Sequence, residues 1–226
     1  MAAPSDNSPG TNLSGLLPHT GEGIVIDIGT GDGRFVSAQA KANPNKFYIG
    51  IDANTKPLEK PSMKATRKSS KGGLPNALFV QASLEDLPEE LNGVADEIHI
   101  HFPWGSLLRA VAIADESVLK ALRRVAAPEC LVEIIIGLDP DRDRQEMERL
   151  GLSEFSSDYV FRKLIPVYEG AGFKVIGHGS LSPHEWRRSN LHGQKDYRET
   201  STGRYFFLSS QPSNPRKIIL PPQSLF

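Results

Sequence analysis

Short apolar runs alternate with stretches of helical periodicity along most of the chain. We predict buried strands where apolar or β-branched runs lie between turn-forming residues. These strands are expected at residues 24–28, 46–51, 77–81, 94–102, 130–137, 173–178 and 203–209. Helices are expected at 34–42, 116–126 and 157–170, and an interrupted helix at 56–70, where Pro57 and Pro61 disturb the pattern.

This alternation predicts an α/β fold built on a doubly wound, mostly parallel seven-stranded sheet. No helical pattern separates the last two strands, so the last strand is expected to pair antiparallel. Residues 181–203 then form a linker long enough to suggest a functional role facing the substrate. We predict one domain at 23–210, with an N-terminal extension at 1–22 and a proline-rich tail at 211–226.

Composition narrows the class of protein. The chain has 226 residues, 23% of them charged, and a single cysteine, Cys130, which excludes a disulfide framework and a cysteine-based zinc site. No apolar run approaches the ~18 residues that a membrane helix needs, and the first residues do not resemble a signal peptide. We expect a cytoplasmic protein without a membrane partner.

Basic residues are concentrated in two segments, although the net charge is −1. Residues 60–83 hold five Lys or Arg and no acid, and residues 179–217 hold seven against three acids. Two such segments on a near-neutral protein predict one positive face, suited to nucleic acid. Solvated helix and loop surface is the alternative for either segment alone.

A glycine-rich turn carries the strongest chemical signal. The sequence Ile26-Asp27-Ile28-Gly29-Thr30-Gly31-Asp32-Gly33 follows a predicted strand and opens a predicted helix. Asp52, followed by Ala53, ends the next strand, where a carboxylate can accept both ribose hydroxyls. Asp27 would repel a diphosphate and suits a cationic amino acid, so we favour S-adenosylmethionine over NAD as the cofactor.

Two further segments follow predicted strands. Residues 81–87 (QASLEDL) are placed to border an adenine, although an acidic helix-initiating turn explains Glu85 equally well. Pro103 and Trp104, in the segment FPWG, lie where ligands bind in open α/β sheets, unless Trp104 is a core residue. His99 and His101 share a strand face, but no third ligand has a suitable spacing, so we expect a structural role and no metal site.

Four segments together carry a family resemblance: IDIGTGDGR, FYIGID, SKGGLPN and FPWGSLL. The chain resembles the aminoglycoside-resistance 16S rRNA (adenine-1408, N1) methyltransferases of the kanamycin–apramycin type. The resemblance is close over residues 24–136 and looser over 146–207. It implies a class I S-adenosylmethionine-dependent methyltransferase fold and a substrate adenine in the 16S rRNA of the 30S subunit; we expect a monomer.

The resemblance also implies roles for individual residues. Asp27, Gly29, Thr30 and Gly31 would hold the methionine end of the cofactor, Asp52 and Ala53 its ribose, Ser83, Leu84 and Glu85 its adenine, with Ser106 close by. Pro103 and Trp104 would bound the methyl-transfer site, and Trp186 would be the second ring that holds the flipped base. The rRNA contacts would come from Lys64, Arg67, Lys68, Lys71, Arg187, Arg188 and Arg204.

The chain departs from the family in the linker, where the family's W-x-K-R-L-A-F-G pattern is missing around Trp186. Two alternatives therefore stay open. One is a tRNA guanine-N7 methyltransferase relative, which shares FYIGID but usually carries an F-P-D-P-W-like segment. The other is a cofactor-binding protein that binds RNA with altered or lost activity.

Overall fold

A computed structural model describes residues 15–17, 22–139, 141–152, 155–181 and 202–210. Seven strands form one sheet in the order β3-β2-β1-β4-β5-β7-β6. The strands are β1 (Ile24–Ile28), β2 (Phe47–Asp52), β3 (Ala77–Gln81), β4 (Ala95–His101), β5 (Ala126–Leu138), β6 (Lys174–Leu181) and β7 (Thr202–Ser209). β7 pairs antiparallel with both β5 and β6, and the other described pairings are parallel, which confirms the predicted fold class.

The helices are α1 (Arg34–Ala42), α2 (Thr55–Ala65), α3 (Gly105–Ala112), α4 (Glu116–Val125), α5 (Arg144–Leu150), α6 (Ser157–Tyr159) and α7 (Ile165–Gly170). Short 3₁₀ turns are η1 (Ser69–Lys71), η2 (Leu84–Asp86) and η3 (Glu89–Leu91), and η4 (Val160–Leu164) is a π-helical turn. None of the helices in the described ranges is long and apolar enough to cross a membrane.

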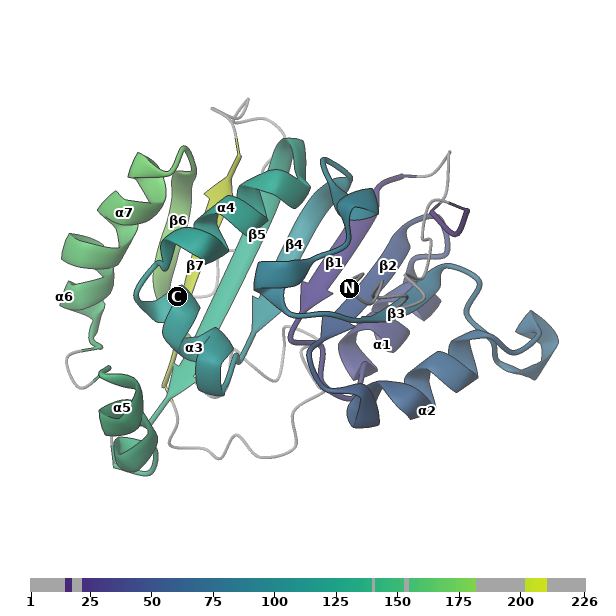
Figure 1. The fold of residues 1–226 in the computed structure, drawn as a ribbon, viewed down its shortest axis with the longest axis horizontal. Coiled ribbons are helices and arrows are strands. Elements are labelled where there is room, and N and C mark those ends of the chain that lie inside the picture. Colours follow the sequence, from purple (N-terminus) through teal and green to yellow (C-terminus); the bar gives the residue numbers. More distant parts are fainter. Residues whose placement is uncertain (1–14, 18–21, 140, 153–154, 182–201, 211–226) are drawn as a thin grey trace, which may run out of the picture.

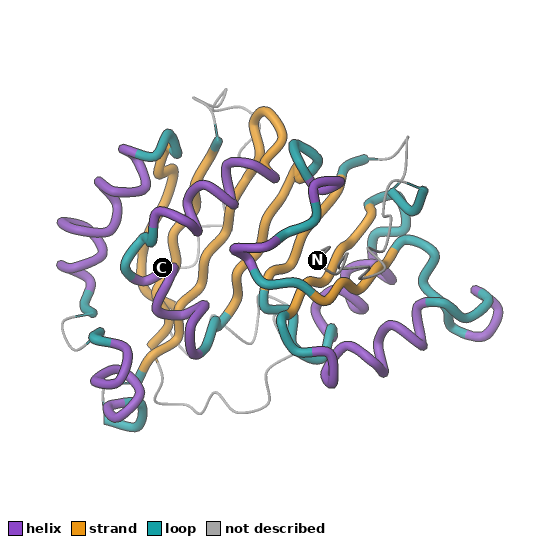
Figure 2. Tube along the Cα trace, in the orientation of Figure 1, coloured by secondary structure: helices purple, strands orange, loops and turns teal. Residues whose placement is uncertain are grey.

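The sheet lies between two layers of helix (Figures 1 and 2). The strand order runs from β1 towards β2 on one side and from β4 towards β5 on the other. Right-handed crossovers in opposite directions place their helices on opposite faces, so α1 covers one face and α4 the other. The order reverses between β1 and β4, and the carboxyl ends of these two strands therefore flank a crevice where ligands bind in such sheets.

The core lies mainly on the α4 face. α4 buries Val118, Leu119, Leu122 and Val125 at helical spacing against the sheet. The Asp115 side chain accepts a hydrogen bond from the Ser117 N–H at 3.0 Å, a cap that stabilises a helix by about 1 kcal/mol. A smaller apolar cluster under α1 holds Val25, Val36, Ala40 and Tyr48.

Two prolines explain where the elements differ from the sequence-based prediction. β5 begins at Ala126 rather than near 130, and Pro128 lies in the irregular stretch where the β4–β5 pairing resumes at Leu131. The helix expected at 157–170 contains the π-helical turn η4 just before Pro166, whose ring would clash with the Arg162 carbonyl in a regular α-helix. The prediction missed α3 and α5.

Candidate active site

The crevice between β1 and β4 brings the two principal motifs together. The glycine-rich turn leaves the carboxyl end of β1, and the FPWG segment leaves the carboxyl end of β4. Figure 1 shows α3 at the end of the sheet towards which the β1 and β4 arrowheads point. A Cβ added to Gly29 would lie 2.7 Å from Leu107 Cδ2, so α3 packs directly against the turn.

The glycine turn is held in a conformation that needs glycine. Gly29, Gly31 and Gly33 have φ of 77°, 55° and 65°. The N–H groups of Gly29 and Thr30 both donate to the Ile51 carbonyl, at 2.8 and 2.9 Å, and tie the turn to β2. A Cβ at Gly31 would meet no atom within 4 Å, so the backbone there borders open space that a ligand can approach.

Asp52 lies beside this turn, as the motif predicts. Its Oδ2 accepts a hydrogen bond from the Gly31 N–H at 2.9 Å, and its Oδ1 accepts one from the Asn54 N–H at 2.8 Å. An ionised carboxylate offers about four acceptor positions, so each oxygen keeps a lone pair for a further donor. The carboxylate therefore both fixes the turn and can accept hydroxyl groups.

Asp27 is the buried acid of the site, with 3% of its surface exposed. Burial raises the pKa of its carboxyl, and the positive charge of His101 is the strongest opposing influence. Among the described residues no Lys or Arg forms an ion pair with it, and the Thr30 hydroxyl is buried without a hydrogen-bond partner. A ligand that carries an ammonium group would supply the missing countercharge, so the chemistry of these residues fits the methionine end of S-adenosylmethionine.

The segment after β3 lies beside the Asp52 loop. The Ala82 N–H donates to the Asp52 carbonyl at 3.1 Å, and the Gln81 amide donates to the Ala53 carbonyl at 3.4 Å. Leu84 is buried in the core and Glu85 is exposed. The structure thus brings Ser83, Leu84 and Glu85 towards the ribose-binding candidates, and their contact with adenine stays a prediction.

The FPWG segment is strained and displays its tryptophan. Phe102 has φ of 51°, an uncommon conformation for a residue other than glycine and one that a following proline disfavours. Such strain is concentrated at functional sites. Pro103 is buried, but Trp104 is 52% exposed, so it is not a core residue. Ser106, in the first turn of α3, is also exposed.

Comparison with known proteins identifies the family. A family model described as NpmA, 16S rRNA (adenine(1408)-N(1))-methyltransferase, matches residues 11–196. The chain belongs to this family. A 16S rRNA (adenine(1408)-N(1))-methyltransferase of Streptoalloteichus tenebrarius is 35% identical over 181 residues, which cover 76% of this chain and 82% of that protein.

Solved structures agree with this membership in the 16S rRNA (adenine(1408)-N(1))-methyltransferase family. The aminoglycoside resistance methyltransferase NpmB1 is 45% identical, with a TM-score of 0.73 over 84% of this chain and 88% of that one. The enzyme of this name from Catenulisporales acidiphilia, solved with its cosubstrate SAM, is 30% identical, with a TM-score of 0.75 over 88% and 90%. A tRNA (guanine-N(7)-)-methyltransferase of a Geobacillus species matches only 36% of the chain, which disfavours that alternative.

The predicted rRNA-binding residues are only partly within the described ranges. Lys64, Arg67, Lys68 and Lys71 are all exposed, at the end of α2 and in the turn that follows it. Arg204 lies in β7, paired with Ile136 of β5 and Ser180 of β6. Trp186, Arg187 and Arg188 lie outside the described residues, and their roles stay predictions.

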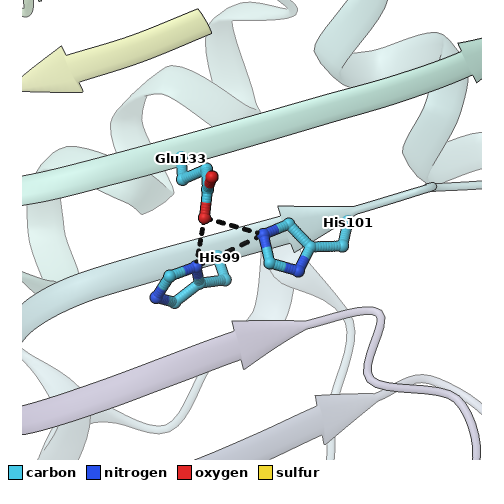
Figure 3. Close-up of side chains that lie close together, drawn as sticks. All are labelled: His99, His101 and Glu133. Carbon is cyan, nitrogen blue, oxygen red and sulfur yellow. Dashed lines mark hydrogen bonds and ion pairs between the residues drawn. The ribbon is translucent and has the colours of Figure 1, made fainter. Parts of the chain in front are cut away.

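One cluster was missed by the sequence analysis. The argument that His99 and His101 lack a third ligand is wrong, because Glu133 of β5 lies beside both of them (Figure 3). The β4–β5 register pairs His99 directly with Glu133, and spacing along the chain does not reveal that pairing. Burial lowers the pKa of His99, but hydrogen bonds to Glu133 and Glu97 outweigh burial and raise it to about 9.

Replacing Asp52 tests the ribose assignment. We expect Asp52→Ala to weaken S-adenosylmethionine binding about 10- to 150-fold, because hydrogen bonds to a charged acceptor contribute ~1.5–3 kcal/mol. Isothermal titration calorimetry measures the effect. Asp86→Ala, at an exposed acid beyond the adenine segment, is the control and should bind normally. Unchanged affinity of Asp52→Ala would remove Asp52 from the cofactor site.

Proposed function

We propose that this chain transfers the methyl group of S-adenosylmethionine to N1 of adenine 1408 in the 16S rRNA of the assembled 30S subunit. Resistance to kanamycin and apramycin follows from that modification. The observation that carries the proposal is the family match over residues 11–196, which includes both the glycine turn and the FPWG segment at one crevice. No described feature favours a second function.

The cofactor supplies, when bound, a methyl group on a positively charged sulfur. In this proposal Asp27 binds the ammonium of the methionine end, and Asp52 accepts hydrogen bonds from the ribose. The turn from Gly29 to Gly31 provides the close backbone approach, because no side chain obstructs it. Ser83 and Glu85 border the adenine.

The substrate base needs no activation by the protein. N1 of adenine has an in-plane lone pair and can attack a methyl group directly, so no general base is required. This agrees with FPWG, in which no carboxylate or amide faces a substrate amine. The task of the site is positioning: reacting atoms aligned at ~3 Å account for a large part of such rate enhancements.

Aromatic stacking would hold the target base outside the RNA helix. Extruding a base costs a few kcal/mol, and stacking on an aromatic ring returns ~1–3 kcal/mol per base. Trp104 suits this role because half of its surface is exposed and the Phe102 turn fixes its place beside the glycine turn. In the proposal Trp186 provides the second ring, from the linker before β7.

We expect Trp104→Ala and Trp186→Ala each to lower the rate of methyl transfer to 30S subunits about 5- to 150-fold, with Phe at either position retaining part of it. Phe161→Ala is the matched control, because Phe161 is 59% exposed but lies on η4 at the β6 edge of the sheet. Transfer rates are measured with a radiolabelled methyl donor.

The two tryptophans have separate diagnostic outcomes. Trp186→Ala should leave cofactor affinity unchanged, because its proposed partner is the base. Full transfer by Trp186→Ala would assign Trp186 to the linker surface and make Tyr197 the next candidate. Full transfer by Trp104→Ala would overturn the stacking role of the FPWG segment.

Drug susceptibility tests the proposed function as a whole. A sensitive bacterium that expresses this chain should become resistant to both kanamycin and apramycin, and one that expresses Asp27→Asn should stay sensitive. Resistance that persists in the Asp27→Asn strain would contradict a methyl-transfer origin. Sensitivity of both strains, with the chain shown to be folded and abundant, would contradict the target.

A further inference from the structure

We propose that His99, His101 and Glu133 form a binding site for one divalent transition-metal ion of the zinc class. The two histidines are alternate residues of β4 and point to the same face of the sheet, and Glu133 lies opposite His99 on β5. Figure 3 shows both rings turned towards one oxygen of Glu133. Three ligand atoms from two strands thus converge on one point.

The distances among these atoms suit an ion. His99 Nδ1 lies 2.8 Å from Glu133 Oε2, His101 Nε2 lies 3.0 Å from the same oxygen, and the two nitrogens are 3.3 Å apart. An ion at ~2.0–2.1 Å from all three atoms would have ligand–ion–ligand angles of roughly 85–107°, within the range of zinc sites with two or more open positions.

Protons alone do not explain the triangle. If both rings donate to Glu133 Oε2, two N–H groups face each other across the 3.3 Å contact between nitrogens. If only one ring donates there, the bare nitrogen of the other faces a carboxylate oxygen, and two acceptors repel. With Glu133 ionised, no arrangement of protons makes all three contacts attractive, whereas one cation at the centre does.

The surroundings resemble the support that proteins build around metal ligands. The second ring nitrogen of His99, Nε2, lies 3.5 Å from Glu97 Oε2, and Glu97 is held by Lys46 at 2.6 Å. A carboxylate behind a metal-binding histidine orients the ring and raises its basicity. The Phe35 ring of α1 packs on both imidazoles, with centroids 5.2 and 4.9 Å away, and limits their movement.

The cluster is sheltered and yet reachable. The side chains of His99, His101 and Glu133 are 15%, 8% and 20% exposed, so an ion can enter and water can complete its coordination. Two imidazoles and a carboxylate favour Zn²⁺, Co²⁺ or Fe²⁺ over Mg²⁺ or Ca²⁺. Binding would release the ring protons and link β4 to β5 beside Asp27, whose register partner on β4 is His99.

The first measurement uses the wild-type chain, freed of metal with a chelator. Titration with ZnCl₂ should give one saturable site per chain by calorimetry, and Zn²⁺ at 100 times its Kd should raise the Tm by about 5–10 °C. Co²⁺ should give saturable visible absorption bands with the same stoichiometry. The absence of both the Zn²⁺ site and the Co²⁺ bands would overturn the proposal without any variant.

Variants locate the site. His101→Gln and Glu133→Gln should lose the stoichiometric Zn²⁺ binding and the shift in Tm. His178→Gln should retain both, because His178 is exposed and lies on β6. Stoichiometric binding that survives in folded His101→Gln or Glu133→Gln would place the ion elsewhere. If these variants do not fold, competition decides: Zn²⁺ must displace Co²⁺ with loss of the visible bands, and failure to do so contradicts a single site.

Discussion

Reversing the charge of Lys64, Arg67, Lys68 and Lys71 together should reduce binding to the 30S subunit about a thousandfold or more at 0.1 M salt, because each phosphate contact contributes about 0.9 to the salt exponent. The four side chains are exposed, and among the described residues none forms an ion pair with an acid. Binding of the variant with four glutamates is measured by filtration or fluorescence anisotropy against salt concentration.

The backbone that carries these residues is tightly fixed. The Leu74 N–H donates to the Ala65 carbonyl at 3.0 Å, and the Gly73 N–H donates to the Lys68 carbonyl at 3.2 Å. A Cβ at Gly73 would collide with the Arg67 carbonyl oxygen, so only glycine allows the chain to close this loop. The basic side chains therefore project from a preformed support, and ordering it costs no affinity on binding.

A matched variant controls for net charge. Lys120, Arg144, Arg162 and Lys163 are exposed on α4, α5 and η4, and their joint replacement by glutamate changes the charge equally. This control should retain 30S binding, and both variants should bind S-adenosylmethionine normally. Equal loss of 30S binding in both variants, or none in either, would show that the α2 segment is not the rRNA contact.

Asp27→Asn should lower S-adenosylmethionine affinity roughly 100-fold or more. Removing one partner of a buried charge pair leaves the other uncompensated, at a cost of ~3–5 kcal/mol. The substitution preserves shape, so the loss reports charge rather than packing. Asp32→Asn is the matched control: Asp32 belongs to the same turn but is exposed and pairs with Arg34. Calorimetry measures both variants.

The outcomes for Asp27→Asn separate binding from folding. We expect its Tm without cofactor to lie near that of the wild type, since an amide is cheaper to bury than a carboxylate. Wild-type affinity in Asp27→Asn would mean that the ammonium group binds elsewhere. A large fall in Tm with unchanged affinity would make Asp27 a structural residue.

The parts of the site that local sequence determines were predictable. The glycine turn, Asp52 and Trp104 each follow directly from a strand end, and the carboxyl ends of parallel strands necessarily meet at one edge of the sheet. α3 was missed because FPWG interrupts the pattern, and its helix begins at Gly105 in a left-handed conformation, with φ of 60°.

Features that depend on strand register were not predictable. The contact between Glu133 and the two histidines of β4 requires the exact pairing of β4 with β5. The β4–β5 pairing itself contains an irregular stretch around Pro128, so counting residues from the helix before it gives the wrong register. The sequence also gives no measure of the burial that raises the pKa of Asp27.

The most direct test of the central claim is to locate the methyl group. Purified 30S subunits from a sensitive bacterium are incubated with the chain and S-adenosylmethionine, and the 16S rRNA is digested and examined by mass spectrometry and primer extension. The account predicts one added methyl, at N1 of adenine 1408, with a primer-extension stop there and none when Asp27→Asn replaces the wild type. Methylation at another nucleotide, or of tRNA guanine N7 instead, would contradict it.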